Sequence, residues 1–248
     1  MPDRHPLPGP TRQELTNREL VDWHDHAEHQ LVHAGRGLLQ VFTSSGSWVV
    51  PSHRAVWIPA GIAHSHRAHG PTRMQTLSFP ATVNPLSLTQ PTVLAVSPLL
   101  REVIVSLTAD VLDPQFTDQQ RDHLVQVALD HLRPIDSSPL HLPTPTDPRL
   151  CDLAAILRAD PADQRSLSEL GAAIGASERT LSRLIRAEIG MSFSRWRTQL
   201  RLHHAIILLA SGLPVTTTAT ACGYGNASAF IEAFRQAFGT TPGRYWVQ

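Results

Sequence analysis

The sequence contains little cysteine and has no long apolar run. Its two cysteines, Cys151 and Cys222, stand alone among 248 residues, which excludes a disulfide framework and a cysteine-rich zinc site. There is no run of about 18 or more apolar residues, the length that a membrane-spanning helix needs. The first residues, MPDRHPLPGPTRQEL, lack the apolar core of a signal peptide. We therefore expect a soluble, cytoplasmic globular protein with no membrane partner.

The formal net charge is also zero, because 21 basic residues balance 21 acidic ones. The balance hides an asymmetry about Pro148. Residues 1–148 contain 10 arginines and 14 acidic residues, whereas residues 149–248 contain 11 and 7, so the formal charges are −4 and +4. Of the 14 histidines, 12 precede Pro148. The chain is thus expected to have two halves of different chemistry, and the basic half is the candidate for binding phosphate.

The first half has the pattern of a β-rich domain followed by helices. Short apolar runs at 38–42, 47–50, 55–58 and 75–79 are separated by turn-forming residues, which favours an antiparallel sandwich or a small barrel. Helical spacing at 98–110 and 118–133 predicts a helical hairpin. Five prolines between 134 and 148 predict a stiff, extended linker. The expected division is therefore a domain over 1–133, a linker over 134–148 and a second domain over 149–248.

Histidines flank the predicted strands. Alternation along a strand places His24 and His26 on one face, and three imidazoles would converge if His64 lay opposite them. Such nitrogen donors suit a divalent transition metal such as zinc, iron or nickel. The alternative is that these histidines lie at the surface or only form hydrogen bonds, which their spacing does not exclude.

The stretch 166–190 predicts two short helices joined by a tight turn. Ser166 and Glu169 form a capping box, Gly175 is suited to a left-handed turn, and Ser177 can cap the second helix. The apolar residues of that helix are spaced to pack inward. Its outward residues are then Glu178, Arg179, Ser182, Arg183 and Arg186. An ordinary solvated surface would be the simplest interpretation of one such helix.

A fainter copy of this pattern follows a long predicted helix at 193–210. Small residues lead to a turn at Gly223-Tyr224-Gly225, and Asn226 can cap the next helix. Phe230, Phe234 and Phe238 share the inward face of that helix. The outward residues of the second copy are Ala227, Ser228, Ile231, Glu232 and Arg235.

Two helix-turn-helix units joined by one long helix, ending in the sequence FGTTPGRY, resemble the DNA-binding region of the AraC/XylS family of transcription regulators. The resemblance covers about 100 residues and implies that the partner is operator DNA. It further implies that Arg179, Ser182 and Arg183 read bases and that Arg186 approaches phosphate. In the second copy, the matching positions are Ala227, Ser228, Ile231 and Glu232. Glu232 stands where many members carry arginine, so we expect the first unit to provide most of the specificity.

In the first half, His24-Asp25-His26, Gln30 and the segment Pro59 to His64 resemble the two cupin motifs. This resemblance implies a barrel in which His24, His26, Gln30 and His64 surround a metal. Metal-binding cupins carry glutamate where this chain has Gln30, so the fourth ligand would be neutral and a metal-free pocket for a small organic effector is the alternative.

Together these features predict an α+β two-domain protein, with an N-terminal cupin-like β-barrel and helical hairpin and a C-terminal all-α domain of two helix-turn-helix units. The expected function is that of a sequence-specific, homodimeric transcription regulator whose barrel senses a small molecule or a metal. One alternative is a cupin metalloenzyme fused to a DNA-binding domain. Another is a regulator whose barrel serves only for dimerisation. We expect no enzymatic activity, because no acid or base pair stands beside the histidines.

Overall fold

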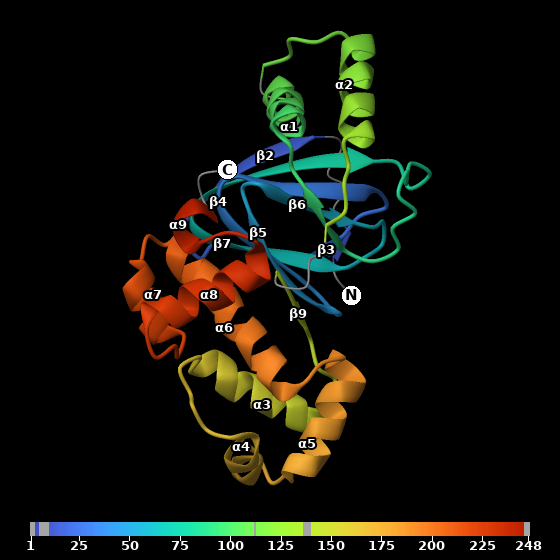
Figure 1. The fold of residues 1–248 in the computed structure, drawn as a ribbon. Helices are drawn as coiled ribbons and strands as arrows, with labels where there is room; N and C mark the ends of the chain where they lie inside the picture. Colours follow the sequence, from blue (N-terminus) through green and yellow to red (C-terminus); the bar gives the residue numbers. More distant parts are fainter. Residues whose placement is uncertain (1–2, 5–9, 112, 136–139, 246–248) are drawn as a thin grey trace. The chain divides into compact units, whose positions relative to one another are not determined.

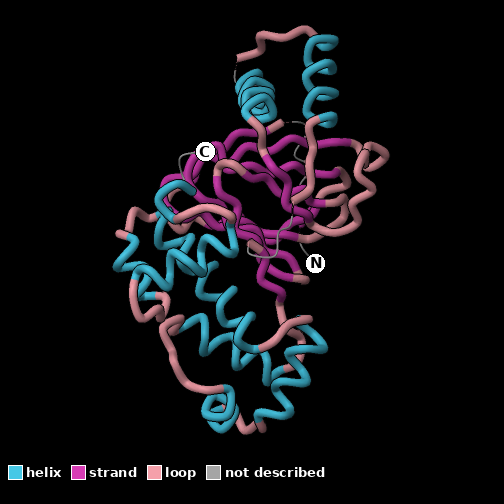
Figure 2. The backbone as a smooth tube through the Cα atoms, in the orientation of Figure 1, coloured by secondary structure: helices cyan, strands magenta, loops and turns pink. Residues whose placement is uncertain are grey.

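The chain forms a largely antiparallel sheet in its first part and a set of helices in its second part. The structure, a computed structural model, describes residues 3–4, 10–111, 113–135 and 140–245. One compact unit comprises Met1–Ser44 and Trp48–Ser137, and the other comprises Ser45–Ser47 and Ser138–Gln248. Strands dominate the first unit and helices the second (Figures 1 and 2). The predicted combination of a β-rich N-terminal region with a helical C-terminal domain is therefore confirmed.

The strands of the first unit are ordered β1-β3-β7-β4-β5 in the sheet, while β2 also pairs with β7, and β6 pairs with β4 and β8. The pairs β2–β7, β3–β7, β4–β7, β4–β6 and β6–β8 are antiparallel, and β1–β3 is parallel. This order does not close on itself among the described residues, so the barrel remains a prediction. The strands are β1 (Asp3–Arg4), β2 (Thr11–Leu15), β3 (Leu20–Asp25), β4 (His29–Thr43), β5 (Gly46–Pro51), β6 (Arg54–Ile58), β7 (His64–Phe79) and β8 (Thr92–Ala95).

Two of these strands are much longer than the apolar runs indicate. Strand β4 has 15 residues and β7 has 16, and they pair along most of their length, with register shifts around Arg36. The runs mark only the stretches rich in apolar residues, whereas backbone hydrogen bonds continue the strands through polar and histidine-rich sequence. The segment Thr11–Leu15, which precedes the first predicted run, also joins the sheet, because β2 pairs with Thr72–Thr76 of β7.

The predicted helical hairpin consists of α1 (Pro98–Asp110) and α2 (Asp118–Asp130), and the second helix ends three residues earlier than expected. The two helices lie side by side next to the sheet (Figure 1). Leu100, Ile104 and Leu107 of α1 are buried in one core with Trp57 and Phe79 of the sheet. Burial of these apolar side chains is the main force that holds the hairpin on the sheet.

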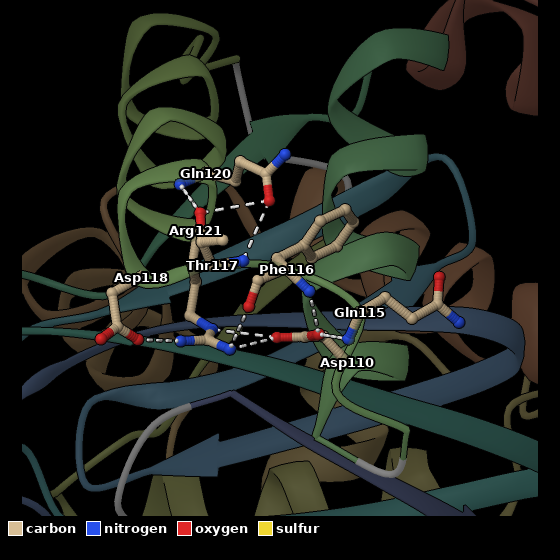
Figure 3. A network of polar contacts seen from close by, with 7 residues as sticks. All are labelled: Asp110, Gln115, Phe116, Thr117, Asp118, Gln120 and Arg121. Carbon is tan, nitrogen blue, oxygen red and sulfur yellow. Dashed lines mark hydrogen bonds and ion pairs between the residues drawn. The ribbon is translucent and has the colours of Figure 1, made fainter.

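The connection between α1 and α2 is built around the carboxylate of Asp110 (Figure 3). Asp110 accepts hydrogen bonds from the backbone N–H groups of Gln115 and Phe116, and Oδ2 also accepts from Arg121 Nε at 2.9 Å and Nη2 at 2.6 Å. Arg121 Nη1 in turn lies 2.9 Å from Asp118 Oδ1. A side chain 2% exposed thus anchors the end of α1 to the first turn of α2.

This arrangement makes the hairpin sensitive to acid. Hydrogen bonds from the Gln115 backbone and the Arg121 guanidinium lower the pKa of Asp110. A lowered pKa means that the stabilisation is fully present above the ordinary aspartate value of about 3.9 and is lost as the pH falls through the folded-state value. We expect the amides of Gln115 and Phe116 to lose protection from hydrogen exchange in that range.

The matched controls for this prediction are Asp110→Asn and Asp122→Asn. Asp122 is exposed on α2 and has no part in the network, so its substitution should leave the exchange profile unchanged. Asp110→Asn should weaken protection already at neutral pH. An unchanged acid profile in Asp110→Asn would show that another group controls the hairpin.

The second unit contains one short strand and the remaining helices. Among its described residues, no helix has both the length and the apolar character needed to cross a membrane, and the same is true of the first unit. These elements are β9 (His141–Pro143), α3 (Pro148–Ala159), α4 (Leu167–Ala173), α5 (Glu178–Leu184), the π-helix η1 (Ile185–Ile189), α6 (Phe193–Ala210), α7 (Val215–Ala221), α8 (Ala227–Phe238) and α9 (Pro242–Tyr245).

The segment predicted as a linker is only partly an extended spacer. Residues 136–139 lie outside the described residues. Beyond them, Leu142 is buried in the core that α3, α4, α5 and α6 share, and Gln199 Nε2 of α6 donates to the carbonyl oxygen of His141. The prolines do extend the chain, but the leucine between them is held in the apolar core. The end of the predicted linker is therefore part of the helical unit.

Candidate functional site

The first helix pair of the second unit has the local structure that its sequence predicts. Ser166 Oγ accepts from Glu169 N at 3.2 Å, while Glu169 Oε2 accepts from Ser166 N at 2.7 Å, which completes the capping box. Gly175 has φ +70°, the left-handed conformation that a turn between the helices requires. Ser177 caps α5 by accepting from Thr180 N. Helix α4, a four-residue connection and helix α5 therefore follow one another as predicted.

The inward residues of this pair determine which face α5 presents to solvent. Leu170 of α4, Leu181 of α5 and Ile185 are fully buried in the core of the unit. The opposite face therefore points outward, with three arginines exposed and a serine half-buried between them. These residues are Arg179, Arg183, Arg186 and Ser182.

Several arginines elsewhere in the second unit are occupied by internal partners. Arg149 pairs with Asp147 at 2.7 Å, and Arg165 pairs with Asp163 at 2.6 Å. In contrast, the three outward arginines of the first helix pair form no hydrogen bond or ion pair within the part of the chain that the structure describes. Their charges remain available to a partner outside the chain, and an anionic one would be favoured.

The helix after Leu184 differs from the continuous α-helix that the spacing predicts. Residues Ile185–Ile189 form a π-helix, and Gly190 ends it with φ +75°. Ile185 and Ile189 are both buried, and Arg186 lies on the wider π-turn between them. The helix that follows α5 is therefore wider than a regular continuation, and Arg186 lies within this wider turn.

Glu188 of this π-helix forms a contact with Thr146 and Asp147 that the sequence did not predict. Its Oε2 accepts from Thr146 N at 2.7 Å, from Thr146 Oγ1 at 3.1 Å and from Asp147 N at 3.2 Å. These hydrogen bonds, led by that of the Thr146 backbone, lower the pKa of the Glu188 carboxyl. The end of the basic helix is thus fastened to the residues that precede α3. No sequence signal marks this pair, because the two positions are about 40 residues apart.

The second helix pair, α7 and α8, repeats the arrangement with less charge. Asn226 caps α8 by accepting from Ala229 N at 2.8 Å, and Phe230 and Phe234 are fully buried. On the outward side, Ser228 and Glu232 are exposed, whereas Ala227 and Ile231 are half-buried.

The carboxylate of Glu232 does not stand alone on that face. Its Oε2 lies 2.7 Å from Arg235 Nη2, and its Oε1 accepts from Gln236 Nε2 at 3.0 Å. Because both groups are exposed, the ion pair adds little stability. It does reduce the negative charge that Glu232 presents, and the i, i+3 spacing of Glu232 and Arg235 was the sequence signal for it.

Helix α6 separates the two pairs without interruption over 18 residues, about 27 Å at the α-helical rise. Trp196 and Leu200 lie in the core of the first pair. Farther along α6, Arg201 donates to the carbonyl oxygens of Pro161 and Asp163 at 3.0 and 2.8 Å. These contacts hold α6 against the rest of the unit, so its two ends are rigidly spaced.

A cluster of buried histidines lies in the first unit, where β3 and β7 pair. His24 is directly opposite His64 in the register, and Val21 is opposite His66. The ring centroids of His24 and His64 are 4.3 Å apart, and that of His66 lies 5.1 Å from His64 and 5.6 Å from His24. One nitrogen from each of these three rings lies within 4.8 Å of the other two.

Hydrogen bonds to the backbone orient two of these rings. His24 Nδ1 lies 2.6 Å from the carbonyl oxygen of Asp22, and His64 Nδ1 lies 2.8 Å from that of Ile62. Because a carbonyl only accepts, each Nδ1 carries the proton, and each Nε2 keeps its lone pair. Burial lowers the pKa of His64 to about 3 and lowers that of His66 well below its usual range. Both rings are therefore neutral at pH 7.

The structure brings three of the four predicted ligands close together, and the fourth, Gln30, lies on another strand. His24 and His64 come together, and the ring of His26 lies beside them, 4.9 Å from His24 and 5.5 Å from His64. Gln30 is buried on β4, where it pairs with Ile58 and Ser78, and it forms no hydrogen bond to a histidine among the described residues. His66 was missed as a member, although its i+2 spacing from His64 on one strand indicates a shared face.

Comparisons with known proteins agree with the helical architecture. A family model described as a helix-turn-helix domain matches residues 170–246. The chain is 35% identical over 225 residues to the HTH-type transcriptional regulator NimR of Escherichia coli. The aligned region covers 90% of this chain and 81% of that protein. A putative AraC-like transcription regulator of Streptomyces antibioticus is 31% identical over 103 residues, or 40% of this chain and 33% of that protein.

Among solved structures, the chain resembles a transcriptional regulator from Chromobacterium violaceum that is described by its AraC-type DNA-binding domain. Sequence identity is 26% and the TM-score is 0.39, with 41% of this chain and 91% of that one covered.

Proposed function

The chain belongs to the AraC/XylS family of DNA-binding transcription regulators rather than to a family of enzymes, and on that basis we propose that its first helix pair reads the operator while its first unit senses a ligand. The observation that carries the proposal is the exposed, unpaired arginine face of α5. Such a face fits the major groove, which admits an α-helix.

Within that face the residues have different roles. Arg179, Ser182 and Arg183 lie on α5 and contact base edges, since arginine forms two hydrogen bonds to O6 and N7 of guanine. Arg186, in the π-helix that follows α5, contacts phosphate, as the family resemblance implies. Phosphate contacts position the protein, whereas base contacts give specificity.

The second helix pair binds an adjacent major groove with less specificity. Its residues at the matching positions, Ala227, Ser228, Ile231 and Glu232, include no cation, and the neighbouring Arg235 is paired with one oxygen of Glu232. Glu232 Oε1 can still accept from the amino group of cytosine. The uninterrupted length of α6, about 27 Å, supports two readers that enter successive grooves about 34 Å apart.

The first unit senses a small molecule or a metal and forms a homodimer. The buried histidines supply an interior polar site, and the hairpin of α1 and α2 is the element through which we expect a second chain to pack. A ligand regulates the protein only if it binds one arrangement of the chain better than another. A regulator whose first unit only dimerises would bind its operator equally well with and without the ligand.

Selection of bound duplexes from a random pool tests the DNA reader. We expect enriched duplexes to share a short motif with guanines on one face of the helix, and a weaker second motif about one helical turn, 10 base pairs, away. Pools selected with the Arg183→Ala chain should lose the guanine at one position of the first motif. Identical enriched motifs from both proteins would contradict the role assigned to α5.

A further inference from the structure

We infer that His24, His64 and His66 together bind one late first-row transition-metal ion such as Zn²⁺, and that Gln30 is not a ligand. The inference rests on the proposed sensing function and names the ligand class of that unit. The cupin motifs imply a different ligand set, which includes His26 and Gln30. The inferred set consists of the three histidines that the pairing of β3 and β7 brings together. The three nitrogens lie within 4.8 Å of one another, and the side chains are 8%, 1% and 2% exposed.

Ring nitrogens of this cluster are buried without hydrogen-bond partners in the part of the chain that the structure describes, and a bound cation would satisfy them. Nε2 of His64 and Nδ1 of His66 are buried and have no hydrogen-bond partner among the described residues. A buried polar atom without a partner costs stability, and adjacent lone pairs repel. A metal ion satisfies all three at once, because each imidazole donates its lone pair to the same centre.

The backbone already prepares two of the rings for this role. Metal-binding histidines commonly donate their second ring N–H to a carbonyl or carboxylate oxygen, which fixes the ring and its tautomer. His24 does so to Asp22 and His64 does so to Ile62, at 2.6 and 2.8 Å. Zinc–nitrogen bonds of about 2.1 Å bring tetrahedral ligands to roughly 3.3 Å from each other, so the rings need to close in only slightly.

The donor set selects the class of metal. Neutral imidazoles suit Zn²⁺, Ni²⁺ and Cu²⁺, whereas Mg²⁺ and Ca²⁺ prefer oxygen ligands. The side-chain oxygen of Gln30 belongs to the second kind, and as a neutral amide it lacks the charge with which a carboxylate attracts a dication. A fourth histidine, His26, lies beside the site, with its ring 4.9 Å from that of His24.

Bound metal would fasten β3 to β7. His24 belongs to β3, while His64 and His66 belong to the long strand β7, which also pairs with β2 and β4. The same strand reaches α1, where Gln75 Nε2 donates to Thr108 Oγ1 at 2.6 Å. Occupation of the site therefore acts on a strand that contacts much of the first unit, which is how a ligand can bias one arrangement over another.

The test measures Zn²⁺ bound to the full chain after dialysis, together with the midpoint of thermal unfolding. We expect one equivalent per chain, a rise in midpoint with Zn²⁺ and no rise with Mg²⁺. His64→Ala and His66→Ala should each weaken Zn²⁺ binding at least tenfold, whereas Gln30→Ala should retain it. His33→Ala is the matched control, because His33 is a fully buried histidine of β4 whose Nε2 bonds the carbonyl of Ser52 instead.

Two results would overturn the inference. One is the absence of stoichiometric Zn²⁺ in the folded chain. The other is loss of Zn²⁺ binding in Gln30→Ala and His26→Ala but not in His66→Ala. That second result would show that the ligands are those implied by the cupin motifs. His66→Gln, which keeps a polar side chain of similar reach, distinguishes loss of a ligand from loss of folding. Operator affinity with and without Zn²⁺ is measured separately: unchanged affinity with one bound equivalent would leave the site in place and contradict the proposed sensing.

Discussion

Replacing Trp196 by alanine is expected to unfold most of the helical unit at temperatures where the native chain is still folded. The indole is completely buried in the core that Leu142, Leu170 and Leu181 also form. Truncation of a buried tryptophan leaves a cavity and costs about 3–5 kcal/mol in the free energy of unfolding. At about 4 °C per kcal/mol, the midpoint of the helical transition should fall by more than about 12 °C, measured by far-ultraviolet circular dichroism.

Arg195→Ala is the matched control for that experiment. Arg195 precedes Trp196 on α6 and is exposed, and alanine keeps the backbone N–H that Ser192 caps. Its midpoint should stay within about 2 °C of the native value, as surface substitutions usually change stability by less than about 0.5 kcal/mol. Equal loss of stability in both variants would show that α6 is not held by its buried face.

Replacing Arg183 by alanine is expected to remove most of the preference for the selected operator while the protein stays folded. The side chain is exposed and forms no hydrogen bond or ion pair in the described part of the chain, so its removal leaves the core intact. A bidentate arginine–guanine contact is worth about 1–3 kcal/mol, or roughly 5–150-fold in affinity. Fluorescence anisotropy with the selected duplex and with an unrelated duplex measures both losses.

Arg186→Ala provides the contrast, because it removes the same charge from a position assigned to phosphate. It should weaken binding to both duplexes alike and reduce the salt dependence of log K by about 1. Arg183→Ala should weaken mainly the selected duplex. If the two variants behave identically, Arg183 contacts the backbone and not a base.

Much of the fold follows from local signals in the sequence. Helix α1 begins and ends where the apolar spacing after Pro98 indicates, and the capping box predicted at Ser166 is present in the structure. Strands β4 and β7 were underestimated because their polar portions carry no apolar pattern. Pairing with neighbouring strands, which no short window of sequence contains, sets their length.

The candidate sites divide in the same way. The outward arginines of α5 are predictable from helical periodicity, since buried leucines on one face determine the other. The histidine cluster is predictable only in part, because the sequence indicates His24 and His64 but the register of β3 and β7 brings in His66. Glu188 likewise acquires its role only when residues near 146 return to the end of the π-helix.

The most direct test of base reading by α5 is a double-mutant cycle between Arg183 and the operator. Each base pair of the selected first motif is replaced in turn, and the affinity of the native and Arg183→Ala chains is measured for every duplex at one salt concentration. We expect one guanine whose replacement costs the native chain about 1–3 kcal/mol but costs the variant almost nothing, because the partner is already gone. Strictly additive losses at every base pair would contradict base reading by Arg183.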